Sequence, residues 1–69
     1  MKIEINTRLK ELRKLNNLTQ IQLPKKLQTT QDTISLWELG KSYPDIEYVV
    51  LLCQIFNVSA DYLLGLKEI

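Results

Sequence analysis

The sequence predicts an all-α domain built from five short helices. Apolar residues recur at helical spacing in every segment, and residues that begin and end helices separate these segments. No segment has the strict apolar–polar alternation of a strand. The 69 residues suffice for one small domain, and 45% apolar with 25% charged residues is a globular rather than a disordered composition.

The first helix is expected over residues 7–15. Asn6 is a good N-cap residue, and Leu9 and Leu12 lie on one face at helical spacing. Two asparagines follow Leu15 and end the helix.

The second helix is expected from Thr19 to about Leu27. Thr19 and Gln22 have the spacing of a capping box, in which each side chain bonds the other residue's backbone N–H. Pro24 lacks the N–H that would bond the carbonyl of Gln20, and its ring crowds that carbonyl. We therefore expect a bend at Pro24 or a poorly formed first turn.

The third helix is expected to begin after Thr30 and to end at Gly40. Residues 28–29 form a short turn before it, and Thr30 is an N-cap residue. Ile34 and Trp37 face inward at i, i+3 spacing, and Gly40 suits the C′ position that ends a helix.

The fourth helix is expected over residues 46–56, with Asp45 as its N-cap, and the fifth over residues 60–64, between Ser59 and Gly65. The fourth helix is apolar on nearly all sides. One stripe consists of Ile46, Val49, Val50, Cys53 and Phe56, and the opposite side carries Tyr48, Leu51 and Ile55. In a chain this small, we expect another subunit to cover the second apolar side.

The composition argues against several classes of protein. There is no histidine to act as a general base, and two isolated glycines cannot form a phosphate-binding loop. The single cysteine, Cys53, leaves no partner for a disulfide or a zinc site, and we expect it to be a small core residue. No apolar run approaches the roughly 18 residues of a membrane span, and residues 1–6 do not resemble a signal peptide. We expect a cytoplasmic protein that is not an enzyme and has no cofactor, metal, membrane contact or evident small-molecule ligand.

Charge is distributed unevenly along the chain. Residues 1–35 carry seven basic and three acidic side chains, a net charge of +4, whereas residues 36–69 carry two basic and five acidic ones, a net charge of −3. The asymmetry indicates either a basic face for an anionic partner or a solvated surface on which charges happen to segregate.

The second and third helices, joined by a tight turn, describe a helix-turn-helix motif at residues 19–38. Further short motifs accompany it in a fixed order. They are Arg8–Arg13 (RLKELR), Leu18–Gln20 (LTQ), Thr33–Glu38 (TISLWE), Gly40–Lys41, Pro44 and Val58–Gly65 (VSADYLLG). The set spans roughly residues 7–65 and resembles the xenobiotic-response-element family, which includes the lambdoid phage repressors and Cro proteins.

The resemblance implies a five-helix lambda-repressor-like domain that binds double-stranded DNA as a homodimer on an inverted repeat. It implies a transcriptional regulator, expected to be a repressor of host or prophage genes. The second helix of such a motif lies in the major groove and presents its N-terminal residues to base edges. Thr30 and the outward residues of the third helix are therefore the expected DNA-binding residues.

Gln31 and Gln20 match glutamine positions of the phage repressors. Gln31 would bond adenine N6 and N7, and the alternative is a solvated residue at the helix start. Gln20 would bond a phosphate and brace Gln31, and the alternative is an amide that only serves the start of its own helix.

The other outward residues each have two interpretations. Asp32 either accepts a hydrogen bond from cytosine N4 or is a favourable charge at a helix N-terminus. Ser35 contacts a phosphate or a base. Leu36, where the family often has a polar or basic residue, contacts a thymine methyl group or another protein.

The resemblance also implies an ion pair between Arg13 and Glu38, which ties the first helix to the end of the third and aims Arg13 at a phosphate. Lys41, Ser42 and Tyr43 follow the third helix, where family members contact the DNA backbone.

The sequence departs from the family in three respects. The outward face of the third helix carries no Lys or Arg, the net charge of the chain is only +1, and Pro24 and Gln28 replace a small alanine and a common glycine. The rival hypothesis is a degenerate helix-turn-helix that contacts another regulator, through an apolar face of Leu36, Tyr48, Leu51 and Ile55. For a homodimer, we expect the interface on the last two helices, at Leu51, Ile55, Phe56, Val58 and Tyr62.

Overall fold

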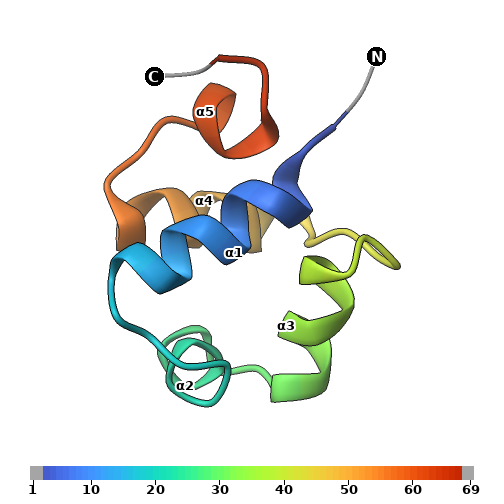
Figure 1. Ribbon diagram of the computed structural model, residues 1–69, viewed down its shortest axis with the longest axis vertical. Helices are drawn as coiled ribbons and strands as arrows, with labels where there is room; N and C mark the ends of the chain where they lie inside the picture. Colours follow the sequence, from blue (N-terminus) through green and yellow to red (C-terminus); the bar gives the residue numbers. More distant parts are fainter. Residues whose placement is uncertain (1–2, 68–69) are drawn as a thin grey trace.

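The computed structural model describes residues 3–67, which form five α-helices and no strand. They are α1 (Ile5–Leu15), α2 (Gln22–Leu27), α3 (Gln31–Glu38), α4 (Ile46–Phe56) and α5 (Ala60–Leu64). Helix α1 crosses the middle of the molecule in front of α4, with α5 at one end and the α2–α3 pair at the other (Figure 1). The predicted all-α, five-helix fold is confirmed. None of these helices is long and apolar enough to cross a lipid bilayer.

The core is a single cluster of buried apolar side chains drawn from all five helices. It consists of Ile5, Leu9, Leu12, Leu23, Leu27, Ile34, Trp37, Leu52, Phe56 and Leu63. Helix α1 contacts both α3 and α5, and α2 contacts both α3 and α4. Each fully buried side chain of this size contributes roughly 1.5–3 kcal/mol, so the core is the main source of stability.

Helix α1 begins two residues before the predicted start, at Ile5, and its N-cap is Glu4 rather than Asn6. Two tertiary contacts explain the difference. The side chain of Ile5 is 1% exposed, so it adds a turn to the apolar face of α1. The N–H of Glu4 donates to the carbonyl of Leu64 at 3.0 Å, which fixes this end of the chain against α5.

The predicted capping box of the second helix is present, but the regular helix begins only at Gln22. Thr19 Oγ1 accepts from the N–H of Gln22 at 3.1 Å, and Gln22 Oε1 accepts from the N–H of Thr19 at 2.9 Å. Pro24 therefore lies in the first turn, where its missing N–H costs least. The predicted poorly formed start of this helix is confirmed.

The other helix ends follow the predictions. Thr30 Oγ1 accepts from the N–H of Thr33 at 3.3 Å, and Ser59 Oγ accepts from the N–H of Tyr62 at 3.1 Å. Gly40 ends α3 with a positive φ of 76°. Asp45 occupies the N-cap position of α4, but its side chain makes no capping hydrogen bond.

The inward face of α4 differs from the predicted stripe. Leu52, which the stripe omitted, is fully buried with Phe56, while Ile46 is 81% and Val50 52% exposed. One turn before Leu52, the ring of Tyr48 packs on Trp37 with centroids 5.3 Å apart. Helical spacing allowed several apolar faces, and the packing of Tyr48, Leu52 and Phe56 at i, i+4, i+8 selected one of them.

Candidate nucleic-acid interface

The α2–α3 motif is held in place by the carboxylate of Glu38, at the end of α3. Arg13 on α1 donates to it twice, from Nε to Oε2 at 2.6 Å and from Nη2 to Oε1 at 3.1 Å. The two side chains are only 10% and 3% exposed. Arg13 Nη1 also donates to the carbonyl of Leu18 at 2.9 Å. One buried ion pair thus joins α1 to the end of α3, as the family resemblance implied. The arginine of this pair also holds the loop that precedes α2.

The phosphate contact expected of Arg13 does not fit this geometry. All three guanidinium nitrogens already donate to groups of the protein, and the residue is 8% exposed. Arg13 therefore positions the motif from inside the fold.

Gln20 lies beside the same carboxylate. Its Nε2 donates to Glu38 Oε1 at 3.0 Å, and the side chain is half-buried. Among the hydrogen bonds of residues 3–67, none joins Gln20 to Gln31, so the expected brace is absent from this structure. A carboxylate is a stronger acceptor than an amide, which explains the preference for Glu38. The second N–H of the amide is left over for another acceptor.

The outward face of α3 lies at the surface. Gln31, Asp32 and Leu36 are exposed and Ser35 is half-buried, whereas Ile34 and Trp37 are buried. Leu39, the C-cap residue, is 63% exposed and extends this face by one turn. The structure therefore brings the predicted base-reading residues together on one side of one helix.

The remaining predicted contact residues flank α3. Thr30 is exposed, but its hydroxyl serves the helix start, since it accepts from the N–H of Thr33 and pairs with Thr33 Oγ1 at 2.9 Å. Lys41 and Tyr43 are exposed and Ser42 is half-buried in the loop after α3.

Four basic side chains from the first half of the chain fall into two groups. Arg8 and Arg13 are used internally: the guanidinium carbon of Arg8 lies 4.4 Å from the centroid of the Tyr62 ring, which ties α1 to α5. Lys25 and Lys26, in the last turn of α2 just before α3, are exposed. The family resemblance assigns no role to these two lysines, and only their charge indicates a possible contact with an anionic partner.

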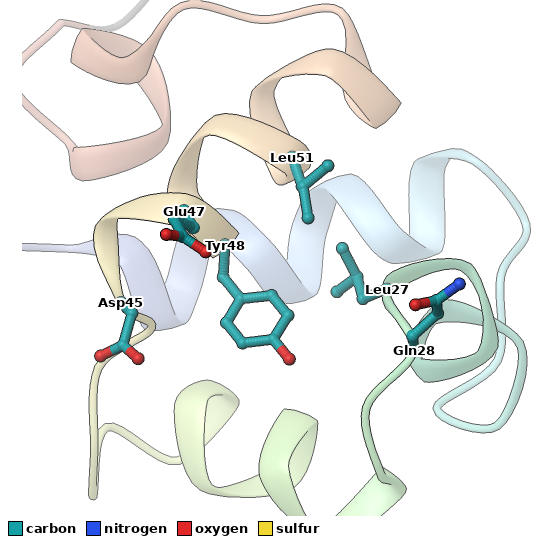
Figure 2. Close-up of a pocket in the computed structure, with 6 residues that line it drawn as sticks. All are labelled: Leu27, Gln28, Asp45, Glu47, Tyr48 and Leu51. Carbon is teal, nitrogen blue, oxygen red and sulfur yellow. The ribbon is translucent and has the colours of Figure 1, made fainter.

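A pocket between the end of α2 and α4 has an unsuitable charge for nucleic acid (Figure 2). Its volume is about 260 Å³, and its lining consists of Leu27, Gln28, Asp45, Glu47, Tyr48 and Leu51. Two carboxylates and no basic side chain line it, so a phosphate would be repelled. Within residues 3–67, no cluster of three or more possible ligands could hold a metal ion.

The residues predicted for a dimer interface do not form one open surface. Phe56 is only 7% exposed and belongs to the core, so it is not available to a partner. Ile55, Val58 and Tyr62 are half-buried and pack against the core, and only Leu51, at 41%, is exposed. The most exposed apolar residues of α4 are instead Ile46 and Val50.

Next to Val50, a shallow groove of about 340 Å³ runs between α4 and the start of α5. It is lined by Val49, Val50, Cys53, Gln54, Asn57, Val58 and Ala60. Cys53 packs against the core from this groove, and burial raises the pKa of its thiol.

Comparison with known proteins places this geometry in a family. Residues 9–63 match the family described as Helix-turn-helix. The HTH-type transcriptional activator BcrR of Enterococcus faecalis is 40% identical over 67 residues, which cover 97% of this chain and 33% of BcrR. The HTH-type transcriptional regulator ImmR of Bacillus subtilis (strain 168) is 34% identical over 67 residues, which cover 97% of this chain and 53% of ImmR. The chain thus spans about a third of the one relative and about half of the other.

A solved structure resembles the fold closely. The crystal structure of the P22 c2 repressor protein in complex with a synthetic operator has a TM-score of 0.81 and 30% sequence identity, and the likeness covers 87% of this chain and 91% of that one. Three findings indicate the same family. They are the match over residues 9–63, the α2–α3 motif and the buried Arg13–Glu38 pair. The chain belongs to the helix-turn-helix family of DNA-binding transcriptional regulators, of the xenobiotic-response-element (Cro/C1) type.

Proposed function

We propose that this chain binds an inverted repeat in double-stranded DNA as a homodimer, reads it with α3 in the major groove, and acts as a repressor in the cytoplasm. The observation that carries the proposal is the exposed outward face of α3, with Gln31 as its first residue, on a motif held in place by the buried Arg13–Glu38 pair. A recognition helix presents its N-terminal residues to base edges, and Gln31 and Asp32 are the first two residues of α3.

Each polar residue of this face has a matching partner in the groove. A glutamine pairs with adenine N6 and N7, so Gln31 would specify adenine at one position of each half-site. Asp32 would accept from cytosine N4, and the same carboxylate would be repelled by phosphates if it met no donor. Ser35, half-buried beside them, would contact a base or the nearest phosphate.

Phosphate contacts would come from the edges of the motif. Gln20 has one free N–H, and the exposed Lys41 and Tyr43 follow α3 with Ser42 between them. We expect about three to five neutralised phosphates per monomer, so log K should fall with log salt at a slope of about −2.7 to −4.5 for each monomer bound.

A homodimer would match an inverted repeat, because each subunit contacts one half-site and the two-fold axes coincide. The P22 c2 repressor, whose fold this chain shares, was crystallised in complex with a synthetic operator. In this chain the exposed aliphatic residues of α4, Ile46, Val50 and Leu51, are the best candidates for the contact between subunits. Repression would follow from occupation of the operator, since bound protein excludes other proteins from that DNA.

A second function is favoured by one observation. The exposed leucines Leu36 and Leu39, with no Lys or Arg on α3, also suit contact with another protein. In that case the motif would bind a second regulator rather than DNA.

The test is selection of bound sequences from a random DNA pool, read by sequencing, for the wild type, Gln31→Ala and Gln54→Ala. Gln54 is an exposed glutamine on α4 and serves as the matched control. We expect an inverted repeat, loss of preference at one position per half-site for Gln31→Ala, and an unchanged motif for Gln54→Ala. Recovery of no motif at low salt by the folded protein would refute the proposal and favour protein contact.

A further inference from the structure

The base-reading face of α3 contains an apolar residue that the polar contacts above do not use. Leu36 is 43% exposed, and it lies one turn after the exposed Asp32 on the same side of the helix. Water contact with so much aliphatic surface is unfavourable by about 25 cal/mol for each Å². A partner that covers Leu36 would remove this cost.

Leu36 differs from the other exposed aliphatic residues in its position. It is the sixth of the eight residues of α3, so it follows Gln31 and Asp32 into the same groove when α3 docks on DNA. Leu39 is more exposed, but it is the C-cap residue, at the end of the helix that leaves the groove. Leu66 is also exposed, and it comes two residues after α5, which lies at the opposite end of the molecule from the α2–α3 pair (Figure 1).

The major groove offers a leucine one favourable partner. The base edges there present hydrogen-bond donors and acceptors, except for the C5-methyl group of thymine. We propose that Leu36 is a specificity-determining residue that recognises the methyl group of a thymine in each half-site. This inference rests on the proposed function, and it adds a second readout to the hydrogen bonds of Gln31 and Asp32.

The proposal separates thymine from uracil. Uracil keeps every hydrogen-bonding group of thymine and lacks only the methyl group, so contacts made by amides and carboxylates do not distinguish the two bases. Burial of one methyl group corresponds to about a fourfold change in affinity. Two half-sites with independent contacts would give about a sixteenfold change.

The experiment measures affinity by fluorescence anisotropy on the operator obtained from the selection above. Uracil replaces thymine at one symmetric pair of positions at a time. The proteins are the wild type, Leu36→Ala, Leu36→Met, and Leu66→Ala as the matched control on the opposite end. Thermal melting by circular dichroism establishes that each variant is folded.

For the wild type we expect one pair of uracils to weaken binding about sixteenfold. Leu36→Ala should bind the thymine and uracil operators alike, while Leu36→Met and Leu66→Ala should keep the discrimination. Equal binding of every uracil operator by the wild type, or full discrimination by Leu36→Ala, overturns the inference. An operator that depends on Gln31 but is indifferent to uracil refutes only the role of Leu36, whereas the lack of any selected operator refutes the proposed function and this inference together.

Discussion

Removal of the Glu38 carboxylate should destabilise the fold more than any surface substitution. In Glu38→Ala, Arg13 would keep its charge in a site where it is 8% exposed, with Nε and Nη2 both deprived of their acceptor. Breaking a buried pair in this way costs about 3–5 kcal/mol. A chain of 69 residues is expected to have a total stability of only about 3–10 kcal/mol. Glu38→Ala should therefore lose a third or more of the folding free energy.

Urea unfolding followed by the fluorescence of Trp37 measures this loss. Trp37 is the single tryptophan and is 4% exposed, so its emission reports on the core next to Glu38. With a slope of about 1 kcal/mol per molar urea for so small a protein, the midpoint should fall by roughly 3 M or more. Glu11→Ala removes an exposed carboxylate from the middle of α1 and should change the stability by less than about 0.5 kcal/mol.

A second variant distinguishes the loss of the ion pair itself from the cost of leaving the Arg13 charge buried without a partner. Arg13→Met with Glu38→Leu removes both charges and keeps the approximate volume of the site, so this double variant should be more stable than Glu38→Ala, although the Leu18 carbonyl and the Gln20 amide each lose a partner. The reasoning is refuted if Glu38→Ala costs less than about 1 kcal/mol, or if the double variant is no more stable than Glu38→Ala.

Three further predictions concern the backbone and the thiol. Gln28→Gly should raise the melting temperature, because φ is +56° at Gln28 and a side chain costs about 1–2 kcal/mol there; a lower value would contradict this. Gly65→Ala should lower it, because φ is +84° and the new Cβ would lie 2.7 Å from Glu4 Cβ; unchanged melting would refute that contact. At pH values near the ordinary thiol pKa, Cys53 should react with a thiol reagent more slowly in the folded protein than in urea, because burial raises its pKa and disfavours the thiolate; equal rates would argue against that burial.

The parts of the fold that sequence reasoning predicted well depend on short-range interactions. The caps at Thr30 and Ser59 each bond an N–H three residues along the chain, so the residue types alone indicate them. The late start of α2 follows in the same way from the missing N–H of Pro24. Each of these features is decided within one turn of helix.

The features that were predicted wrongly depend on contacts between segments that are distant in the sequence. The start of α1 is set by the bond from Glu4 to Leu64, 60 residues away in the chain. Several apolar faces of α4 were compatible with helical spacing, and the burial of Leu52 was decided by its neighbours in the core. In the candidate site, the partner of Gln20 is Glu38 because α1 and α3 pack together around Arg13. The outward direction of Gln31 was predictable, since Ile34 and Trp37 fix the opposite side of α3.

The use of charge inside the fold has a consequence for DNA recognition. Arg8 and Arg13 stabilise contacts of α1 with α5 and α3, so two of the basic side chains of the first half are engaged within the fold. The face of α3 carries one charge, the acidic Asp32, which is repelled by any DNA that does not offer it a donor. If α3 reads DNA as proposed, we expect a low non-specific affinity, which depends on phosphate neutralisation, while matched base contacts would keep their full value. On this reasoning the small domain would discriminate between DNA sequences by having little affinity for DNA in general, rather than by having many contacts to an operator.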